Sequence, residues 1–238
     1  MQKLIKLGIG FWVLTLAAPY SAEVELLFSL VEQSHEHRGM APQVRREDIA
    51  KKLRESLAGA KSRIFIAIYS ITHIKITNAI IKAKNKVITD AKTDREQKIE
   101  IKVIVDKKAM NDENVLASIQ ELVAAGIHVR TFNPSKIGKE EGFMHNKYAI
   151  IDNIFWTGSF NFTNGAQDKN QENVAIMKGN QELIEQTLHS FNILWEYSDR
   201  VMPLAPLPPH NLKDEYYRKR TQDEDDDRHE GSKQYKRS

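Results

Sequence analysis

A histidine and a lysine, His145 and Lys147, stand two residues apart at the head of the apolar stretch MHNKYAIIDN, residues 144–153. Alternate residues of a β-strand share a face, so this spacing directs both side chains to one side. A neutral imidazole can act as a nucleophile near neutral pH, and an ammonium group beside it attracts an anion. The pair predicts a site for a negatively charged group, although by itself it also fits an exposed polar strand edge.

A second alternate pair follows in GSFNFT, residues 158–163. Ser159 and Asn161 share one face, while Phe160 and Phe162 occupy the opposite face, which we expect to be buried. Hydroxyl and amide groups donate hydrogen bonds to phosphate oxygens, as a lysine does. The two pairs together predict a phosphate site.

Asp152 lies seven positions after His145, so on a strand it points to the other face. We expect it to support the strand end and the turn at Asn153. The short distance from Asp152 to Gly158 makes the register of this hairpin important, because a slip of one residue would turn Ser159 and Asn161 away from the site.

Composition limits the possible chemistry. The chain of 238 residues has 41% hydrophobic and 28% charged residues, which is typical of a soluble globular protein. It has no cysteine, which excludes disulfides, thiolate zinc sites and cysteine nucleophiles. His35 and His37 lack further partners in the sequence and are interpreted as surface residues. We therefore predict no metal and no cofactor.

Apolar periodicity predicts alternating helices and strands. The expected helices cover residues 47–60, 76–98 (running into a polar stretch), 113–126 and 181–197, and the expected strands cover 63–71, 99–106, 127–132, 144–151 and 173–177. Gly126 is placed to end the third helix. This order predicts an α/β fold, with a mixed β-sheet flanked by helices on both faces.

The two ends of the chain differ from this central part. Residues 1–22 have lysines first, then an apolar run, then small residues, which is typical of a secretory signal peptide or of an uncleaved membrane anchor. Residues 203–238 begin with a proline-rich linker and continue as a charged tail, for which we expect disorder. The catalytic domain is predicted over residues 23–202, and the protein is predicted to be secreted or periplasmic, or else membrane-anchored.

The pattern H-x-K-x4-D, followed by G-S-x-N and then by N-x-E-N, resembles the phospholipase D superfamily. The single copy is similar to its small members, the bacterial endonucleases and phospholipases D and the mitochondrial cardiolipin hydrolases. The resemblance covers roughly residues 24–198, and it implies a phospholipase D-like sandwich of sheet and helices. One departure is that the spacing between Asp152 and Gly158 is shorter than is usual in the family.

The resemblance also implies roles for the residues. His145 would attack phosphorus and form a phosphohistidine intermediate, and Glu172 would orient its ring. Lys147, Ser159 and Asn161 would hold the phosphate oxygens, and Asp152 belongs to the same catalytic motif. The expected activity is that of a metal-independent phosphodiesterase.

The substrate stays open between phospholipid and nucleic acid, because both activities use the same catalytic residues. Nearby basic residues could grip a nucleic-acid backbone or could simply form a solvated helix face; they are Lys82, Lys84, Lys86, Lys92, Arg95 and Lys98. Phe143 and Trp156 could touch lipid or bases, although we expect them to pack in the core. An alternative function is a catalytically silent module that binds phosphate or nucleic acid.

The full pattern H-x-K-x4-D occurs only once in the chain. Displacement at phosphorus needs a nucleophile and also a proton donor for the leaving oxygen, and members with two motifs supply one histidine for each role. We therefore expect a two-fold homodimer that shares one active site, with His145 from each subunit. Membrane association through the N-terminal segment is the other predicted interaction.

Overall fold

The computed structural model describes residues 22–29, 48–89, 96–139 and 142–203. Nearly all of these belong to one compact unit, which ends at Val201. The predicted signal or anchor, the HEH sequence at 35–37 and the charged tail from residue 204 lie outside the described residues. Among the described helices, none has the length and apolar character needed to cross a membrane.

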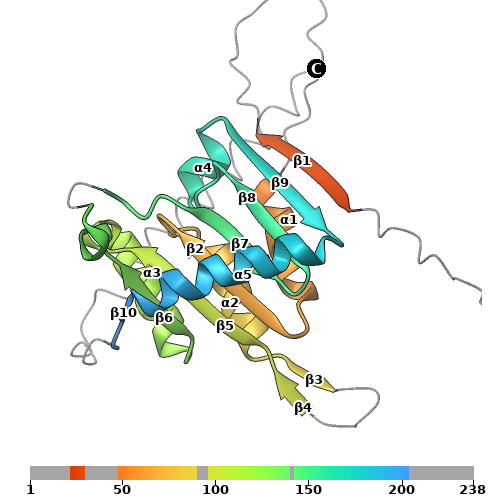
Figure 1. Ribbon diagram of the computed structural model, residues 1–238, viewed down its shortest axis with the longest axis horizontal. Helices are drawn as coiled ribbons and strands as arrows, with labels where there is room; N and C mark the ends of the chain where they lie inside the picture. The colour runs from red at the N-terminus through yellow and green to blue at the C-terminus, as the bar shows by residue number, and fades with distance from the viewer. Residues whose placement is uncertain (1–21, 30–47, 90–95, 140–141, 204–238) are drawn as a thin grey trace, which may run out of the picture. The chain divides into compact units, whose positions relative to one another are not determined.

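One mixed sheet of eight strands forms the frame of this unit (Figure 1). Across the sheet the strands are β1 (Glu23–Ser29), β9 (Glu172–Lys178), β8 (Ile154–Gly158), β7 (Lys147–Ile151), β2 (Arg63–Ile68), β5 (Glu100–Asp106), β6 (His128–Phe132) and β10 (Asp199–Arg200). Strands β2, β5 and β6 are parallel to one another, and the remaining neighbours pair antiparallel. The predicted mixed sheet is confirmed.

Helices cover both faces of the sheet, as predicted. In Figure 1, α5 (Gln181–Glu196) crosses the near face, while α1 (Ile49–Gly59), α2 (Ile74–Lys84) and α3 (Glu113–Ala124) lie behind it. A short helix, α4 (Asn164–Asp168), and two single 3-10 turns, Lys108–Asn111 and Pro134–Ile137, complete the elements of the connecting segments. Gly126 follows α3 with a φ of 75°, a conformation that glycine adopts without steric cost.

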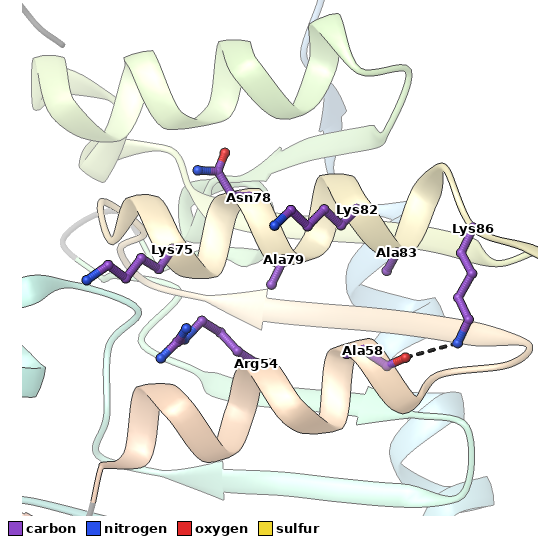
Figure 2. A pocket seen from close by; sticks show the side chains of 8 residues that line it. All are labelled: Arg54, Ala58, Lys75, Asn78, Ala79, Lys82, Ala83 and Lys86. Carbon is purple, nitrogen blue, oxygen red and sulfur yellow. Dashed lines mark hydrogen bonds between the residues drawn. The ribbon is translucent and has the colours of Figure 1, made fainter.

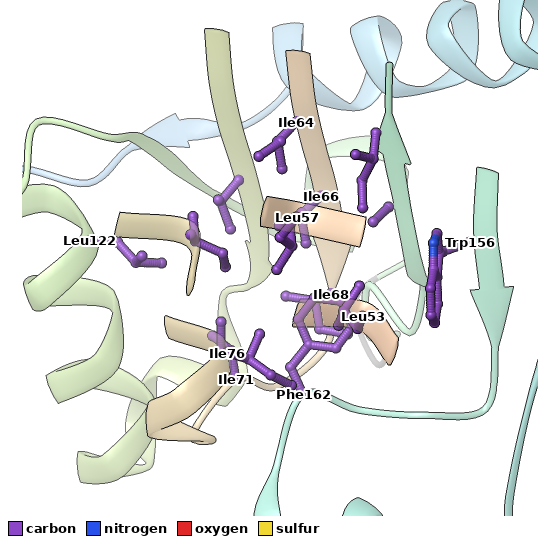
Figure 3. Packing of buried hydrophobic residues seen from close by; sticks show 14 of the residues in the cluster. Leu53, Leu57, Ile64, Ile66, Ile68, Ile71, Ile76, Leu122, Trp156 and Phe162 are labelled. Atoms are coloured by element: carbon purple, nitrogen blue, oxygen red, sulfur yellow. The ribbon is translucent and has the colours of Figure 1, made fainter. Parts of the chain in front are cut away.

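Two hydrophobic layers hold the helices to the sheet. The larger layer lies under α1, α2 and α3 and contains Leu53, Leu57 and Ile76 from the helices together with Ile64, Ile66 and Ile68 from β2 (Figure 3). The smaller layer packs α5 against the other face, where Phe65 and Phe191 stack with ring centroids 5.0 Å apart. Because both faces of β2 and β5 are covered, these strands are largely apolar in the sequence.

Two sequence predictions are corrected here. The helix that begins at α2 ends at Lys84, and the residues after it form a two-stranded ribbon, β3 (Val87–Thr89) with β4 (Glu96–Lys98). Trp156 is buried in the core as expected, but Phe143 is 52% exposed. Phe143 is therefore available on the surface close to His145.

Candidate active site

His145 lies just before β7, which begins at Lys147, so it is not itself part of the strand. The segment is nevertheless fixed against β2, since Tyr69 donates a backbone hydrogen bond to the Asn146 carbonyl at 2.9 Å. The Lys147 Nζ donates to the carbonyl of His145 at 3.0 Å. The two predicted residues are thus brought together, with the imidazole exposed to solvent.

Tyr69 lies against both of them and was not identified from the sequence. Its ring centroid is 5.0 Å from that of His145, and the Lys147 Nζ is 5.4 Å from the same tyrosine ring. Phe143 meets the ring of Tyr69 edge-on at 5.9 Å. This aromatic contact limits the positions open to the imidazole, and it places an exposed aromatic ring beside the site.

Asp106 is a second residue that sequence reasoning missed. It is the last residue of β5 and is completely buried. One carboxylate oxygen accepts from the backbone N–H groups of Lys108 and Ala109, at 2.8 and 3.0 Å, and the other accepts from that of Met144 at 2.7 Å. The residue before the histidine is therefore fixed to the end of a central strand. An acid closing an apolar strand run was the available sequence signal.

Ser159 and Glu172 meet where β8 ends and β9 begins, at the same end of the sheet as His145 and Lys147. The Ser159 Oγ donates to a Glu172 carboxylate oxygen and accepts from the backbone N–H of Asn173 at 3.0 Å. Gly158 permits this approach, because a Cβ there would lie 2.1 Å from the Asn173 carbonyl oxygen. The single proton of the Ser159 hydroxyl is used by Glu172, so its predicted bond to phosphate requires this contact to be exchanged.

Glu172 is only 8% exposed and is held on several sides. Its second oxygen accepts from the Asn170 amide at 3.0 Å, and its backbone N–H donates to the hydroxyl of Ser29 on β1 at 2.9 Å. The predicted hydrogen bond from the imidazole of His145 to the carboxylate of Glu172 is absent from the described contacts. Within one chain the carboxylate positions Ser159 instead.

Lys147 and Glu172 interact through their charges. Burial lowers the pKa of Lys147, and the negative charge of Glu172 acts in the opposite direction. A partly desolvated ammonium group interacts more strongly with an anion than a fully hydrated one does. The lysine is therefore suited to a phosphate oxygen, with Glu172 favouring its charged form.

Asn161 lies on the loop after β8. Its side-chain oxygen is buried and has no donor among the described residues. An amide rotated by 180° presents its nitrogen in the same place, and that nitrogen can donate to an anion. Phe160 and Phe162, on either side, are buried in the core as predicted.

Asp152, predicted among the catalytic residues, is not brought to the site. It stands at the opposite end of β7, where its carboxylate accepts from the backbone N–H groups of Lys61, Ser62 and Arg63 at 2.8 to 3.0 Å. Burial acts to raise the pKa of Asp152, but these hydrogen bonds bring it below its usual value. The expected role in supporting the strand end matches this placement, and a direct catalytic role does not.

The hairpin after β7 keeps the register that the site needs. Ile151 pairs with Ile154, which leaves Asp152 and Asn153 as the turn, and Ala149 pairs with Trp156. Asp152 accommodates the tight turn with a φ of 53°. The short spacing is absorbed by the turn, and Ser159 reaches Glu172.

This end of the strands thus carries an imidazole, an ammonium group and an amide together with the carboxylate–hydroxyl pair of Glu172 and Ser159. In the residues that the structure describes, no three histidine, aspartate or glutamate side chains are grouped to hold a metal ion. The arrangement can bind an anionic group at Lys147 and present it to the imidazole of His145. An imidazole beside a bound anionic group is chemically suited to covalent catalysis.

Comparison with known proteins gives a consistent result. Residues 53–195 match the family model described as cardiolipin synthase, PLD-like domain. The phospholipase D of Rickettsia conorii is 31% identical over 133 residues, which cover 56% of this chain and 56% of that protein. The phospholipase D of Rickettsia felis is 26% identical over 209 residues, 80% of this chain and 94% of that protein. A mitochondrial cardiolipin hydrolase of Chlamydomonas reinhardtii is 28% identical over 141 residues, 59% of this chain and 54% of that protein.

Solved structures share the fold. Nuc from Salmonella typhimurium, a phospholipase D family member, superposes with a TM-score of 0.58 at 23% identity, covering 76% of this chain and 98% of that one. NucT from Helicobacter pylori gives 0.57 at 21% identity, with 76% and 99% covered. The mixed sheet and its helices are therefore those of a known fold.

Proposed function

The chain belongs to the phospholipase D superfamily, whose domain model spans residues 53–195, and we propose that it is a phosphodiesterase. The observation that carries the proposal is the arrangement at one sheet edge, where Lys147 bonds the His145 carbonyl and Ser159 bonds Glu172. Relatives named phospholipase D and cardiolipin hydrolase support a hydrolase of this type. Phospholipid and nucleic acid are the two substrate classes.

The proposed reaction has two steps. An imidazole nitrogen of His145 attacks phosphorus, an N–P bond forms, and the bond from phosphorus to the leaving oxygen breaks as that oxygen takes a proton. Water then attacks the phosphohistidine, which releases the phosphate monoester and restores the imidazole. The ammonium of Lys147 stabilises the charge on the phosphate oxygens in both steps.

We expect turnover to survive chelation, because side chains of this chain supply the positive charge at the phosphate. The measurement is hydrolysis of bis(p-nitrophenyl) phosphate before and after dialysis against EDTA, in parallel with assays on single-stranded DNA, RNA, phosphatidylcholine and cardiolipin. Complete loss in EDTA, restored by a divalent ion, would show that the mechanism is different. A protein without turnover on any of these diesters would instead be a binding module.

We also propose that two chains share one site. In the described residues the ring of His145 contacts Tyr69 and no second histidine, so the proton donor for the leaving oxygen has to come from elsewhere. A two-fold homodimer supplies it as the partner copy of His145. The two imidazoles would titrate as a coupled pair and give a bell-shaped pH profile.

Mixing experiments test the shared site. Wild-type chains are exchanged with increasing amounts of the His145→Asn variant, and specific activity is followed per wild-type chain. We expect this activity to fall steeply, because each mixed dimer has lost one of its two imidazoles. Constant activity per wild-type chain, with subunit exchange demonstrated by differently tagged chains, would refute the shared site.

A further inference from the structure

A groove of about 420 Å³ runs between α1 and α2, on the helix layer of the larger core. Its titratable lining residues are all basic, and its remaining lining is small or neutral. The lining consists of Arg54, Ala58, Lys75, Asn78, Ala79, Lys82, Ala83 and Lys86 (Figure 2). None of these residues belongs to the active site described above.

Most of this positive charge is not neutralised. Lys86 donates to the carbonyls of Ala58 and Ala60, at 3.0 and 3.3 Å, and so joins the ends of the two helices. The Arg54 Nε donates to a carbonyl of its own helix at 3.2 Å. Within the described parts of the chain, no carboxylate forms an ion pair with any of the four basic groups. Arg54, Lys75 and Lys82 therefore keep charges available for a ligand.

The charges form a row and not a single point. Lys75 and Lys82 are seven residues apart on α2, which places them on the same face of the helix. Seven helical residues rise about 10 Å, a length that accommodates about three phosphates at the ~3.4 Å axial spacing of one strand of a duplex. A row of this length is better matched by a repeating polyanion than by one lipid headgroup.

The Lys75 end of the groove lies next to the active-site loop. Just before α2, the backbone N–H groups of Thr72 and His73 both donate to the carbonyl of Phe162 at 2.9 Å. Phe162 directly follows Asn161, the predicted phosphate ligand. A strand held in the groove therefore has one end close to the loop that carries a catalytic-site residue.

His73 lies at this end of the groove, close to the positive charges of Arg54 and Lys75. It is 8% exposed, and its Nδ1 has no hydrogen-bond partner among the described residues. Burial, with contributions from the positive charges of Arg54 and Lys75, lowers the pKa of His73 to about 4. The imidazole is thus kept neutral, and the positive charge at this end of the groove is carried by Arg54 and Lys75.

We propose that the α1–α2 groove binds the phosphate backbone of single-stranded nucleic acid. Its apolar lining consists of alanine, without the large aliphatic or aromatic side chains that insert into a membrane surface. The absence of aromatic lining also means that bases are not stacked there, so binding should be independent of sequence and sensitive to salt. This site goes beyond the proposed catalytic function and can be tested without turnover.

The test uses the full chain carrying His145→Asn, so that no substrate is consumed. Binding of a fluorescein-labelled 12-nucleotide oligothymidylate is measured by fluorescence anisotropy between 50 and 200 mM NaCl. The groove variant combines Arg54→Gln, Lys75→Gln and Lys82→Gln. We expect it to bind about tenfold or more weakly at low salt, with the salt slope reduced by about 2, since each single-strand phosphate contact contributes about 0.7.

A matched control combines Lys136→Gln, Lys178→Gln and Arg200→Gln, which removes the same formal charge from exposed or half-buried positions elsewhere on the sheet and its loops. We expect its affinity to change less than about threefold. Equal losses of affinity in both variants would mean that only net charge matters, and would refute the proposal that the groove is the binding site. Loss of binding to anionic phosphatidylglycerol vesicles without loss of oligonucleotide binding would assign the groove to a membrane instead.

A second readout separates this inference from the proposed function. With His145 restored, the groove variant should hydrolyse bis(p-nitrophenyl) phosphate at the wild-type rate, because the small diester does not reach the groove. Lost turnover of this substrate would mean that the groove substitutions disturb the catalytic edge. Oligonucleotide binding that depends on the groove in a protein without turnover would refute the catalytic proposal alone.

Discussion

Replacing His145 by asparagine is expected to abolish hydrolysis, with a loss of at least about a thousand-fold in kcat. Asparagine keeps a polar side chain of similar size but cannot form a bond to phosphorus that is later hydrolysed. The residue is exposed, and among the described residues its imidazole makes only a ring contact with Tyr69, so the free energy of unfolding should change by less than about 1 kcal/mol. Turnover of bis(p-nitrophenyl) phosphate and thermal unfolding are the two measurements.

The control for this variant is His128→Asn, an exposed histidine at the start of β6. It should retain wild-type turnover and similar stability. A radiolabelled phosphodiester, quenched during turnover, should label the wild-type chain and the control but not the His145 variant. Wild-type turnover in the His145→Asn protein would show that His145 is not the nucleophile.

Replacing Asp106 by asparagine is expected to lower both stability and activity. The carboxylate accepts three backbone hydrogen bonds while fully buried, and an amide can accept with only one of its two positions. Its NH₂ group would then face the N–H of either Met144 or Lys108. An unpaired buried donor costs about 1–3 kcal/mol, and a shift of about 1 Å at His145 is expected to cost about a hundred-fold in kcat.

Asp112→Asn is the matched control for Asp106. The Asp112 carboxylate also accepts from two backbone N–H groups, those of Asn114 and Val115 at 2.8 and 3.4 Å, but it caps α3 away from His145. Both variants should unfold at lower temperature, whereas only the Asp106 variant should lose kcat when measured well below its melting temperature. Equal kcat in the two folded variants would show that Asp106 stabilises the fold without positioning the site.

Much of the fold was accessible from the sequence because local patterns and tertiary burial agree there. The apolar runs of β2 and β5 and the helical periodicity of α1 and α3 each have a single consistent interpretation. The region after Lys84 was harder, since KNKVIT continues a plausible helix while its ends pair as the β3–β4 ribbon. That pairing joins residues from Val87 to Lys98, and helical periodicity gives no sign of it.

Within the site, sequence determined which groups are present and tertiary structure decided what they contact. The spacing of His145 and Lys147, and of Ser159 and Asn161, predicts a phosphate-binding site from residue types alone. The partners of Glu172, the isolation of Asp152 and the support from Asp106 depend on strand order, which brings β5, β7 and β9 into one sheet. Hydrogen bonds reach only about 3 Å, so residues distant in sequence meet only where strand register aligns their ends. That register is set by the burial of whole strands in the core, so it cannot be predicted from a short motif.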